Sequence, residues 1–420
     1  MDQVKFLKER VERKFGSAIK DAATLKLLLI HINKSSDLDL SYNTLRRFFG
    51  FLAPTKPNIN TLNGLSQYVG FRNFYSFSNQ HNFPNWEPWL YVLRLKQQEK
   101  ISEEDIQFFN SQVNNQNFVF YFIDVATHFI NQKNEAVCLK LFEIKFDTLV
   151  KSEQLRVSLA LGILLRHSYG KDTSFISALL QSPPFRRIVV YNFIDYSNFN
   201  FGYMELIHQS IQFEKERDHL LFLHLLSSYH GFLNGHPKKA LRLSEYCNLK
   251  EAHPIVQGRY YAYLLYSSPE SKRKAIFKQL ITESKFYDKN QIFFEIIPTL
   301  ILLRRTDLIA LIYNRYYEEI FDIDGFNQLT HLWIYQIGQV FLSIKEGHHE
   351  RAASELEKVN INLALDSYID YIKLFSFIAR YHLEEDKVGI KQQYTNLANK
   401  LGFKVFSVDL LECYFKIAFA

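Results

Sequence analysis

Cysteine, glycine and proline are scarce in this chain. Its three cysteines, Cys138, Cys247 and Cys413, lie far apart among 420 residues and form no CxxC pair. This spacing fits neither a disulfide framework nor a zinc cluster, and it predicts buried apolar thiols in a reducing compartment. With only 15 glycines and 10 prolines, the chain has too few turn residues for a turn-rich β protein.

Long apolar runs are also missing. No uncharged apolar stretch approaches the roughly 18 residues that a membrane-spanning helix needs. The first residues, MDQVKFLKERVERKF, alternate in charge and lack the apolar centre of a signal peptide. We therefore expect no membrane contact and a cytoplasmic location.

The common sequence signatures of enzymes are absent. The chain has no Walker loop, no GxGxxG and no GxSxG motif. His219, His224 and His230 fall in one predicted helix, but spacings of five and six residues do not align them on one face as metal ligands. The sequence nominates no catalytic residue, no metal site and no cofactor, and we expect a protein that is not an enzyme.

Aromatic residues are abundant instead. Phe, Tyr and Trp make up 16% of the chain, with 38 Phe and 25 Tyr, enough to fill a large core. Apolar residues recur at helical spacing in successive segments, which predicts an all-α protein. The predicted helices in the central part are Phe118–Ile130, Glu135–Val150, Glu153–His167, Asp218–Phe232 and Lys238–Cys247.

Pairs of these predicted helices share a helix–turn–helix sequence pattern. Leu223–Cys247 and Trp333–Val359 each show an aromatic helix, a short turn with Gly and His, and a second helix, and Tyr368–Leu401 follows more loosely. Repeated hairpins that cannot bury their faces alone stack into a solenoid. Because the period is irregular, a non-repetitive helical domain is the alternative.

The segment Leu40–Phe71 contains two short predicted helices. Ser41 can cap a helix with Leu45, Phe48 and Phe49 on its core side, and Gly50 ends that helix. After a turn with Pro54 and Pro57, a second helix begins near Asn60 and ends near Gly70. Residues 1–80 hold 12 Lys and Arg against 6 Asp and Glu. Their net charge of +6 equals that of the whole chain, as expected of a segment that meets a polyanion.

This segment resembles the lambda-repressor/Cro-like helix-turn-helix domains, through S-x-x-T-L-R-R-x-x-G followed by P-x-x-x-T-L-x-x-L-x-x-Y-x-G. The later hairpins resemble tetratricopeptide-type repeats, and together the two parts resemble bacterial regulators. The resemblance implies a small helix-turn-helix domain in residues 1–80, a joint in 81–100, and an α-solenoid of tetratricopeptide-like helical hairpins in 101–420. In such regulators the repeat body binds a peptide or protein partner in its groove and mediates homodimer formation. This chain departs from the family in its longer turn before Ser41, and its repeats lack a clean consensus.

Double-stranded DNA is the partner that the helix starting after Ser41 is expected to meet. Asn43 and Arg46 present the paired groups that suit adenine and guanine edges, with Tyr42 and Arg47 on the same side. Phosphate contacts are predicted for a second set of residues: Arg47, Lys34, Lys56 and Arg72, with Ser41 and Asn58 as neutral contacts.

An enzyme with an undeclared site, such as a nuclease or a defence-system effector, is disfavoured because the charged residues are too scattered to nominate a catalytic cluster. Two other functions stay open. Asp37 and Asp39 lie close to the predicted contact surface and oppose DNA binding, so a helix-turn-helix used only for protein contact is one alternative. The other is a protein–protein interaction scaffold in which the helical body carries the function and the first 80 residues act as an adaptor.

Overall fold

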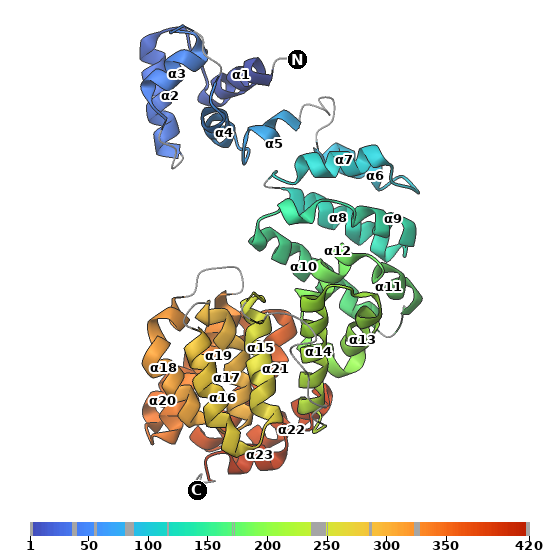
Figure 1. Cartoon of the computed structure of the whole chain (residues 1–420), viewed down its shortest axis with the longest axis vertical. Helices are drawn as coiled ribbons and strands as arrows, with labels where there is room; N and C mark the ends of the chain where they lie inside the picture. The colour runs from blue at the N-terminus through green and yellow to red at the C-terminus, as the bar shows by residue number, and fades with distance from the viewer. Residues whose placement is uncertain are drawn as a thin grey trace. The chain divides into compact units, whose positions relative to one another are not determined.

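The chain is all-α, as the sequence predicts. The computed structural model describes residues 3–35, 40–53, 57–79, 88–115, 117–169, 171, 173–236, 249, 251–284, 288–322 and 328–416. Within these ranges every regular element is a helix or a helical turn and no strand occurs (Figure 1). The chain forms two compact units, Met1–Leu161 and Gly162–Ala420.

The first unit begins with a group of helices that we call the head. They are α1 (Gln3–Phe15), α2 (Ala22–Ser35), α3 (Tyr42–Phe49), α4 (Ile59–Tyr68) and α5 (Phe74–Asn79). Helix α3 packs against α2, and α4 packs against α1 and α5. The head has an apolar core of its own, built from Leu7, Val11, Ile19, Leu25, Leu28, Ile32, Leu45, Phe48, Leu62, Leu65, Tyr68 and Phe77.

The remainder of the first unit is a short series of packed helices. It contains α6 (Pro88–Leu95), α7 (Glu103–Gln112), α8 (Phe118–Asn131), α9 (Glu135–Leu141), the 3₁₀ turn η2 (Phe146–Thr148) and most of α10 (Lys151–Leu165). Helix α6 falls within the predicted joint 81–100, and residues 81–87 of that joint lie outside the described residues.

One predicted helix in this part was too long. Instead of spanning Glu135–Val150, α9 ends at Leu141. The reason is that Phe142, Ile144 and Phe146 are all buried. At about 100° per residue, a helix would turn Ile144 away from the face that Phe142 and Phe146 share. A 3₁₀ turn after an irregular link buries all three.

The second unit begins with short and irregular helices. After the last residues of α10 come η3 (Arg166–Ser168), α11 (Thr173–Leu179), α12 (Pro183–Phe185), the π-helical turn η4 (Arg186–Tyr191), η5 (Tyr196–Asn198), η6 (Phe199–Tyr203), α13 (Met204–Phe213) and α14 (Arg217–Leu233). Aromatic side chains from this part lie in the core, where the ring of Tyr196 stacks on that of Tyr371 with centroids 4.3 Å apart.

Longer helices follow. They are α15 (Pro254–Ser267), α16 (Glu270–Glu283), α17 (Lys289–Leu302), α18 (Thr306–Phe321), α19 (Gln328–Lys345), α20 (His349–Glu357), η9 (Ile361–Leu363), α21 (Asp366–Leu383), α22 (Lys387–Leu401) and α23 (Val408–Cys413). Odd-numbered helices from α15 to α21 pack on one another in sequence, and each also packs against the even-numbered helix that follows it. Two predicted hairpins, at Trp333–Val359 and Tyr368–Leu401, correspond to α19–α20 and α21–α22. The second helix of the third, at 238–247, lies outside the described residues.

Helix α17 is the centre of this unit. All of its residues from Ile292 to Leu302 are buried, including Glu295 and Thr299. A helix that is apolar on all sides is enclosed by its neighbours, and α17 packs against α15, α18 and α19.

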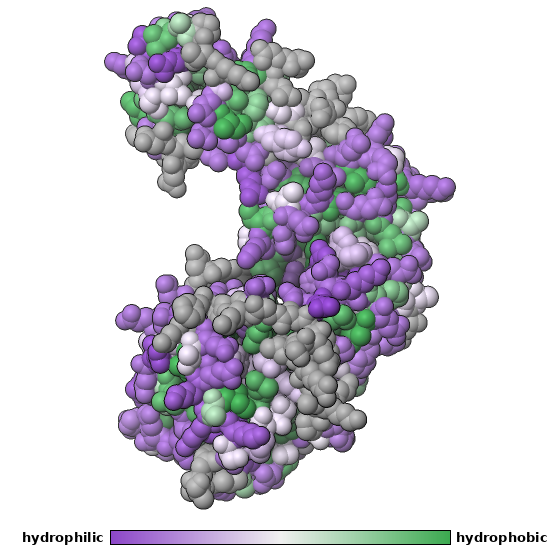
Figure 2. Space-filling view, viewed as in Figure 1, coloured by the Kyte–Doolittle hydropathy of each residue, from purple (hydrophilic) through white to green (hydrophobic). Residues whose placement is uncertain are grey.

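On the face drawn in Figure 2, hydrophobic residues form separate patches among hydrophilic ones.

Candidate nucleic-acid interface

Helix α3 begins and ends at the predicted residues. The Ser41 side chain accepts a hydrogen bond from the Thr44 backbone N–H at 3.2 Å, which caps the helix. At the other end Gly50 adopts φ 87°, and the Phe51 N–H donates to the Arg46 carbonyl at 2.8 Å. Because the left-handed conformation at Gly50 favours glycine, the chain turns sharply after two turns of helix.

The two faces of α3 differ in the predicted way. Leu45 and Phe48 are buried in the head core and Phe49 is half-buried. Asn43 and Arg47 are exposed on the other side. The helix therefore presents an amide and a guanidinium to solvent while two apolar side chains hold it to the head.

Tyr42 and Arg46 form a partly buried cluster with a residue of α2. The Tyr42 hydroxyl donates to the Ala22 carbonyl at 3.4 Å. The Arg46 guanidinium lies 5.7 Å from the Tyr42 ring centroid, and the Lys26 ammonium lies 5.9 Å from it. Both distances are within cation–π range. Two cations thus flank one aromatic ring beside Asn43.

Lys26 is the residue of this cluster that the sequence prediction missed. It is exposed and precedes Tyr42 by sixteen residues on another helix. Its position on the exposed side of α2 could be inferred from the helical period, since Leu25 and Leu28 face the core. The packing of α2 on α3 brings Lys26 to Tyr42, and no local sequence pattern predicts that packing.

Two other predicted contact residues have defined roles in the head. Asn58 is exposed and caps α4, because its side chain accepts from the Asn60 N–H at 3.0 Å. Arg72 is exposed, but its Nη1 donates to Asn114 Oδ1 at 3.3 Å and to the Thr148 carbonyl at 2.9 Å. Arg72 therefore links the head to later residues of the first unit, and its phosphate contact stays a prediction.

Several predicted residues cannot be placed. Lys56 lies outside the described residues, as do Asp37 and Asp39. Lys34 belongs to α2, but its side chain is not among those described. The positive groups with known positions at this surface are therefore Lys26, Arg46 and Arg47.

The helix that follows α3 is fixed to the rest of the head through Tyr68. Its hydroxyl forms a hydrogen bond with His31 Nδ1 at 2.8 Å, and its carbonyl accepts from the Lys14 ammonium. Burial raises the pKa of Tyr68 above its usual value. These contacts join α4 to α1 and α2. The helices that support α3 are therefore held together by both polar and apolar contacts.

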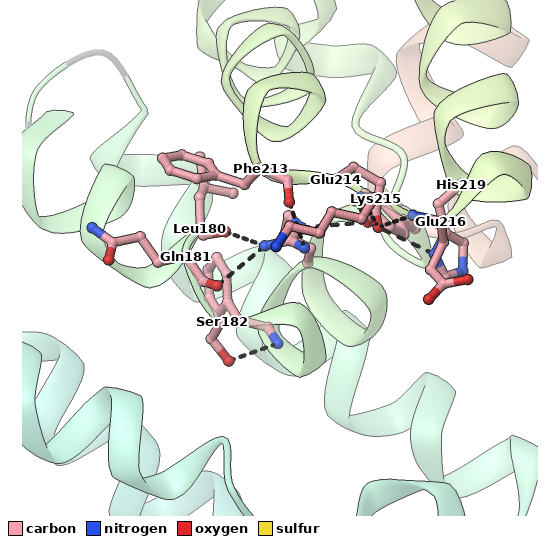
Figure 3. Close-up of polar contacts among 11 residues, drawn as sticks. Leu180, Gln181, Ser182, Phe213, Glu214, Lys215, Glu216 and His219 are labelled. Atoms are coloured by element: carbon pink, nitrogen blue, oxygen red, sulfur yellow. Dashed lines mark hydrogen bonds and ion pairs between the residues drawn. The ribbon is translucent and has the colours of Figure 1, made fainter.

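A buried polar network around Glu214 in the second unit is the alternative candidate site (Figure 3). Glu214 accepts from the Tyr191 hydroxyl at 2.5 Å, from the backbone N–H groups of Lys215 and Glu216, and from Arg186 at 3.4 Å. Burial acts to raise the pKa of Glu214, but the hydrogen bonds from Tyr191 and the two backbone groups outweigh it and lower that pKa.

This network is occupied by its own members. Arg186 also donates to the carbonyls of Leu180, Gln181 and Phe213 at 2.6, 3.2 and 3.3 Å. It therefore ties the π-helical turn η4 to the end of α13. A carboxylate that already accepts from four partners is suited to holding the fold rather than to proton transfer.

The described part of the chain contains no group of three or more His, Cys, Asp or Glu residues placed to hold a metal ion. None of its helices combines the length and apolar character needed to cross a bilayer. No protein-family model matches the chain, and no curated protein or solved structure is significantly similar to it.

Proposed function

We propose that this protein is a sequence-specific DNA-binding regulator of transcription whose head places α3 in the major groove of double-stranded DNA. The observation that carries the proposal is the exposed polar side of α3. There Asn43 and Arg47 are exposed, and Arg46 lies with Lys26 around the Tyr42 ring. The opposite side of α3 is anchored in the head core.

The chemistry of these side chains suits the major groove. The Asn43 amide can donate to and accept from adenine N6 and N7, and the Arg46 guanidinium can donate to guanine O6 and N7. Arg47 and Lys26 offer positive charge to the phosphates on either side. Each phosphate contact lowers the slope of log K against log salt by about 0.9.

The helical body, predicted as residues 101–420, would control how the heads bind DNA. We propose that it binds a peptide or protein partner, or joins two chains into a homodimer. Two heads in a dimer would occupy half-sites about one helical turn apart. A partner would alter DNA binding by favouring one arrangement of the two heads.

The test begins with the full chain and a random pool of DNA duplexes. From the enriched sequence, one duplex is taken for binding measurements with Asn43→Ala and Arg46→Ala. Each change should cost about 1–3 kcal/mol, roughly 5- to 150-fold in affinity, and should relax preference at one base position. Arg47→Ala should weaken all sequences alike and make the salt slope less steep by about 1.

Lys400→Ala provides the matched control. It removes one exposed positive charge from the second unit, where Lys400 pairs with Asp370. It should leave affinity and sequence preference unchanged. If Asn43→Ala and Arg46→Ala behave like this control, α3 does not contact bases and the proposal is wrong.

A second candidate function is supported by exposed apolar residues on α2 of the head. Leu27 and Ile30, three residues apart on α2, are 59% and 50% exposed. Exposed aliphatic side chains on one helix face favour a protein contact. In that case the head is an adaptor of a non-catalytic scaffold. A gel-shift assay of the full chain at low and physiological salt distinguishes the two, because the scaffold gives no retarded DNA complex at either.

A further inference from the structure

A groove in the second unit lies between α16 and α18. Helix α16 packs against α15 and α18 packs against α17, while α15 and α17 pack closely on each other. The two outer helices border a groove of about 970 Å³. Its lining residues are Lys274, Phe277, Lys278, Ile281, Thr282, Asp307, Leu308, Leu311, Asn314 and Arg315.

The groove has apolar residues from both helices. Phe277 and Leu308 are buried, and Ile281 is half-buried. Leu311 is 53% exposed although it lies among them. An apolar surface with a half-exposed leucine can bury further area when a partner covers it.

The charged residues at the groove are mainly basic. Lys274, Lys278 and Arg315 are exposed, and none of them forms an ion pair with another residue whose position is described. The one carboxylate, Asp307, is held by Arg305, which donates to its two oxygens at 2.7 and 2.6 Å. The groove therefore has three positive groups against one carboxylate, and the charge of that carboxylate is shared between Arg305 and Lys274.

The dimensions suit a short helix. Lys274 and Thr282 are eight residues apart on α16, which corresponds to about 12 Å, or a little more than two helical turns. Apolar side chains of a bound helix at i, i+3 or i+4, and i+7 span a similar length. Acidic residues beside them would face the three cations.

We propose that the groove between α16 and α18 binds an acidic amphipathic helix of a partner protein. A nucleic acid is the weaker choice, because a phosphate backbone would leave the apolar residues uncovered. This inference deepens the proposed function by naming the chemistry of the body's partner. Its experiment uses no DNA in the main measurement, so either proposal can fail while the other stands.

The experiment is a selection with the full chain. A displayed library of 14-residue helix-forming peptides varies the apolar and charged positions independently, and bound peptides are enriched over several rounds. We expect sequences with Leu, Ile or Phe at i, i+3 or i+4, and i+7, and with negative net charge. One enriched peptide is then synthesised with a fluorescent label for affinity measurements.

Two variants test the groove with that labelled peptide. Leu311→Ala should weaken binding roughly tenfold through the lost apolar contact. Lys274→Glu combined with Lys278→Glu should weaken it by about tenfold or more at low salt and by less at high salt. Lys272→Glu is the matched control, because Lys272 is exposed on α16 but does not line the groove, and it should have little effect. Circular dichroism confirms that each variant is folded.

Three results would overturn the proposal. The first is that the natural chain enriches peptides from the library no more strongly than the Leu311→Asp variant does. The second is a set of enriched peptides without negative charge. The third is equal loss of affinity in the groove variants and in Lys272→Glu. A labelled DNA duplex can be measured with the same variants. If it binds the natural chain and loses affinity only in the groove variants, the groove is a nucleic-acid site instead.

Discussion

Replacing one partner of the buried ion pair Arg259–Glu295 should strongly destabilise the second unit. Arg259 Nη2 lies 2.9 Å from Glu295 Oε1, and the two side chains are only 4% and 8% exposed. The pair joins α15 to α17 at the centre of the unit. Burial raises the pKa of Glu295 above its usual value, and Arg259 offsets that rise only in part.

The expected magnitude follows from the surroundings of Arg259. Its Nη2 lies 3.5 Å from the Tyr196 hydroxyl, and its Nε is buried without a hydrogen-bond partner among the described residues. The cavity beside the pair is about 10 Å³, at the lower limit for one water molecule. Glu295→Leu therefore leaves a guanidinium in the core without a counter-ion, at a cost of about 3–5 kcal/mol. The double replacement Arg259→Met, Glu295→Leu removes both charges and should be close to neutral or stabilising.

Native-state hydrogen exchange of α15 and α17 in the full chain measures these effects, because it reports on the second unit separately from the first. Urea denaturation followed by circular dichroism provides a second reading. Glu384→Gln is the control: it breaks the half-buried i, i+4 pair Arg380–Glu384 and should cost less than about 0.5 kcal/mol. The reasoning is refuted if Glu295→Leu costs no more than this control, or if the double variant is as unstable as the single one.

Two further predictions concern a histidine and a helix cap. Burial lowers the pKa of His331 from 6.5 to about 4, so the unfolded state binds more protons between these values and stability falls as the pH drops through that window. At 1.36 kcal/mol per pKa unit, and with allowance for the partial exposure of the ring, the loss is about 2–3 kcal/mol. Urea denaturation at pH 7 and pH 4 should show this dependence reduced in His331→Gln, and equal dependence would contradict it. Ser41→Ala removes the cap of α3 and should cost about 1 kcal/mol, seen as faster hydrogen exchange in α3 but not in α8; unchanged exchange would mean that the cap is not needed.

The head was the part most open to prediction from sequence. Ser41, the apolar pair Leu45 and Phe48, and Gly50 are local signals, and each acts within two turns of one helix. For that reason the start and the end of α3 were correct, and so was the burial of Leu45 and Phe48, whereas Phe49 is only half-buried. The length of α9 was not, because helical periodicity does not show that Phe142, Ile144 and Phe146 must all be buried together.

By itself, the sequence determined the all-α class, the bounds of α3 and the polar side on which Asn43 and Arg47 lie. These depend on backbone preferences and on the helical period, which act between near neighbours. Only the tertiary structure decided that Lys26 lies beside Tyr42, that Arg259 meets Glu295, and that α16 and α18 border a groove. Such contacts join residues from different helices, and they depend on how the helices pack, which no local pattern specifies.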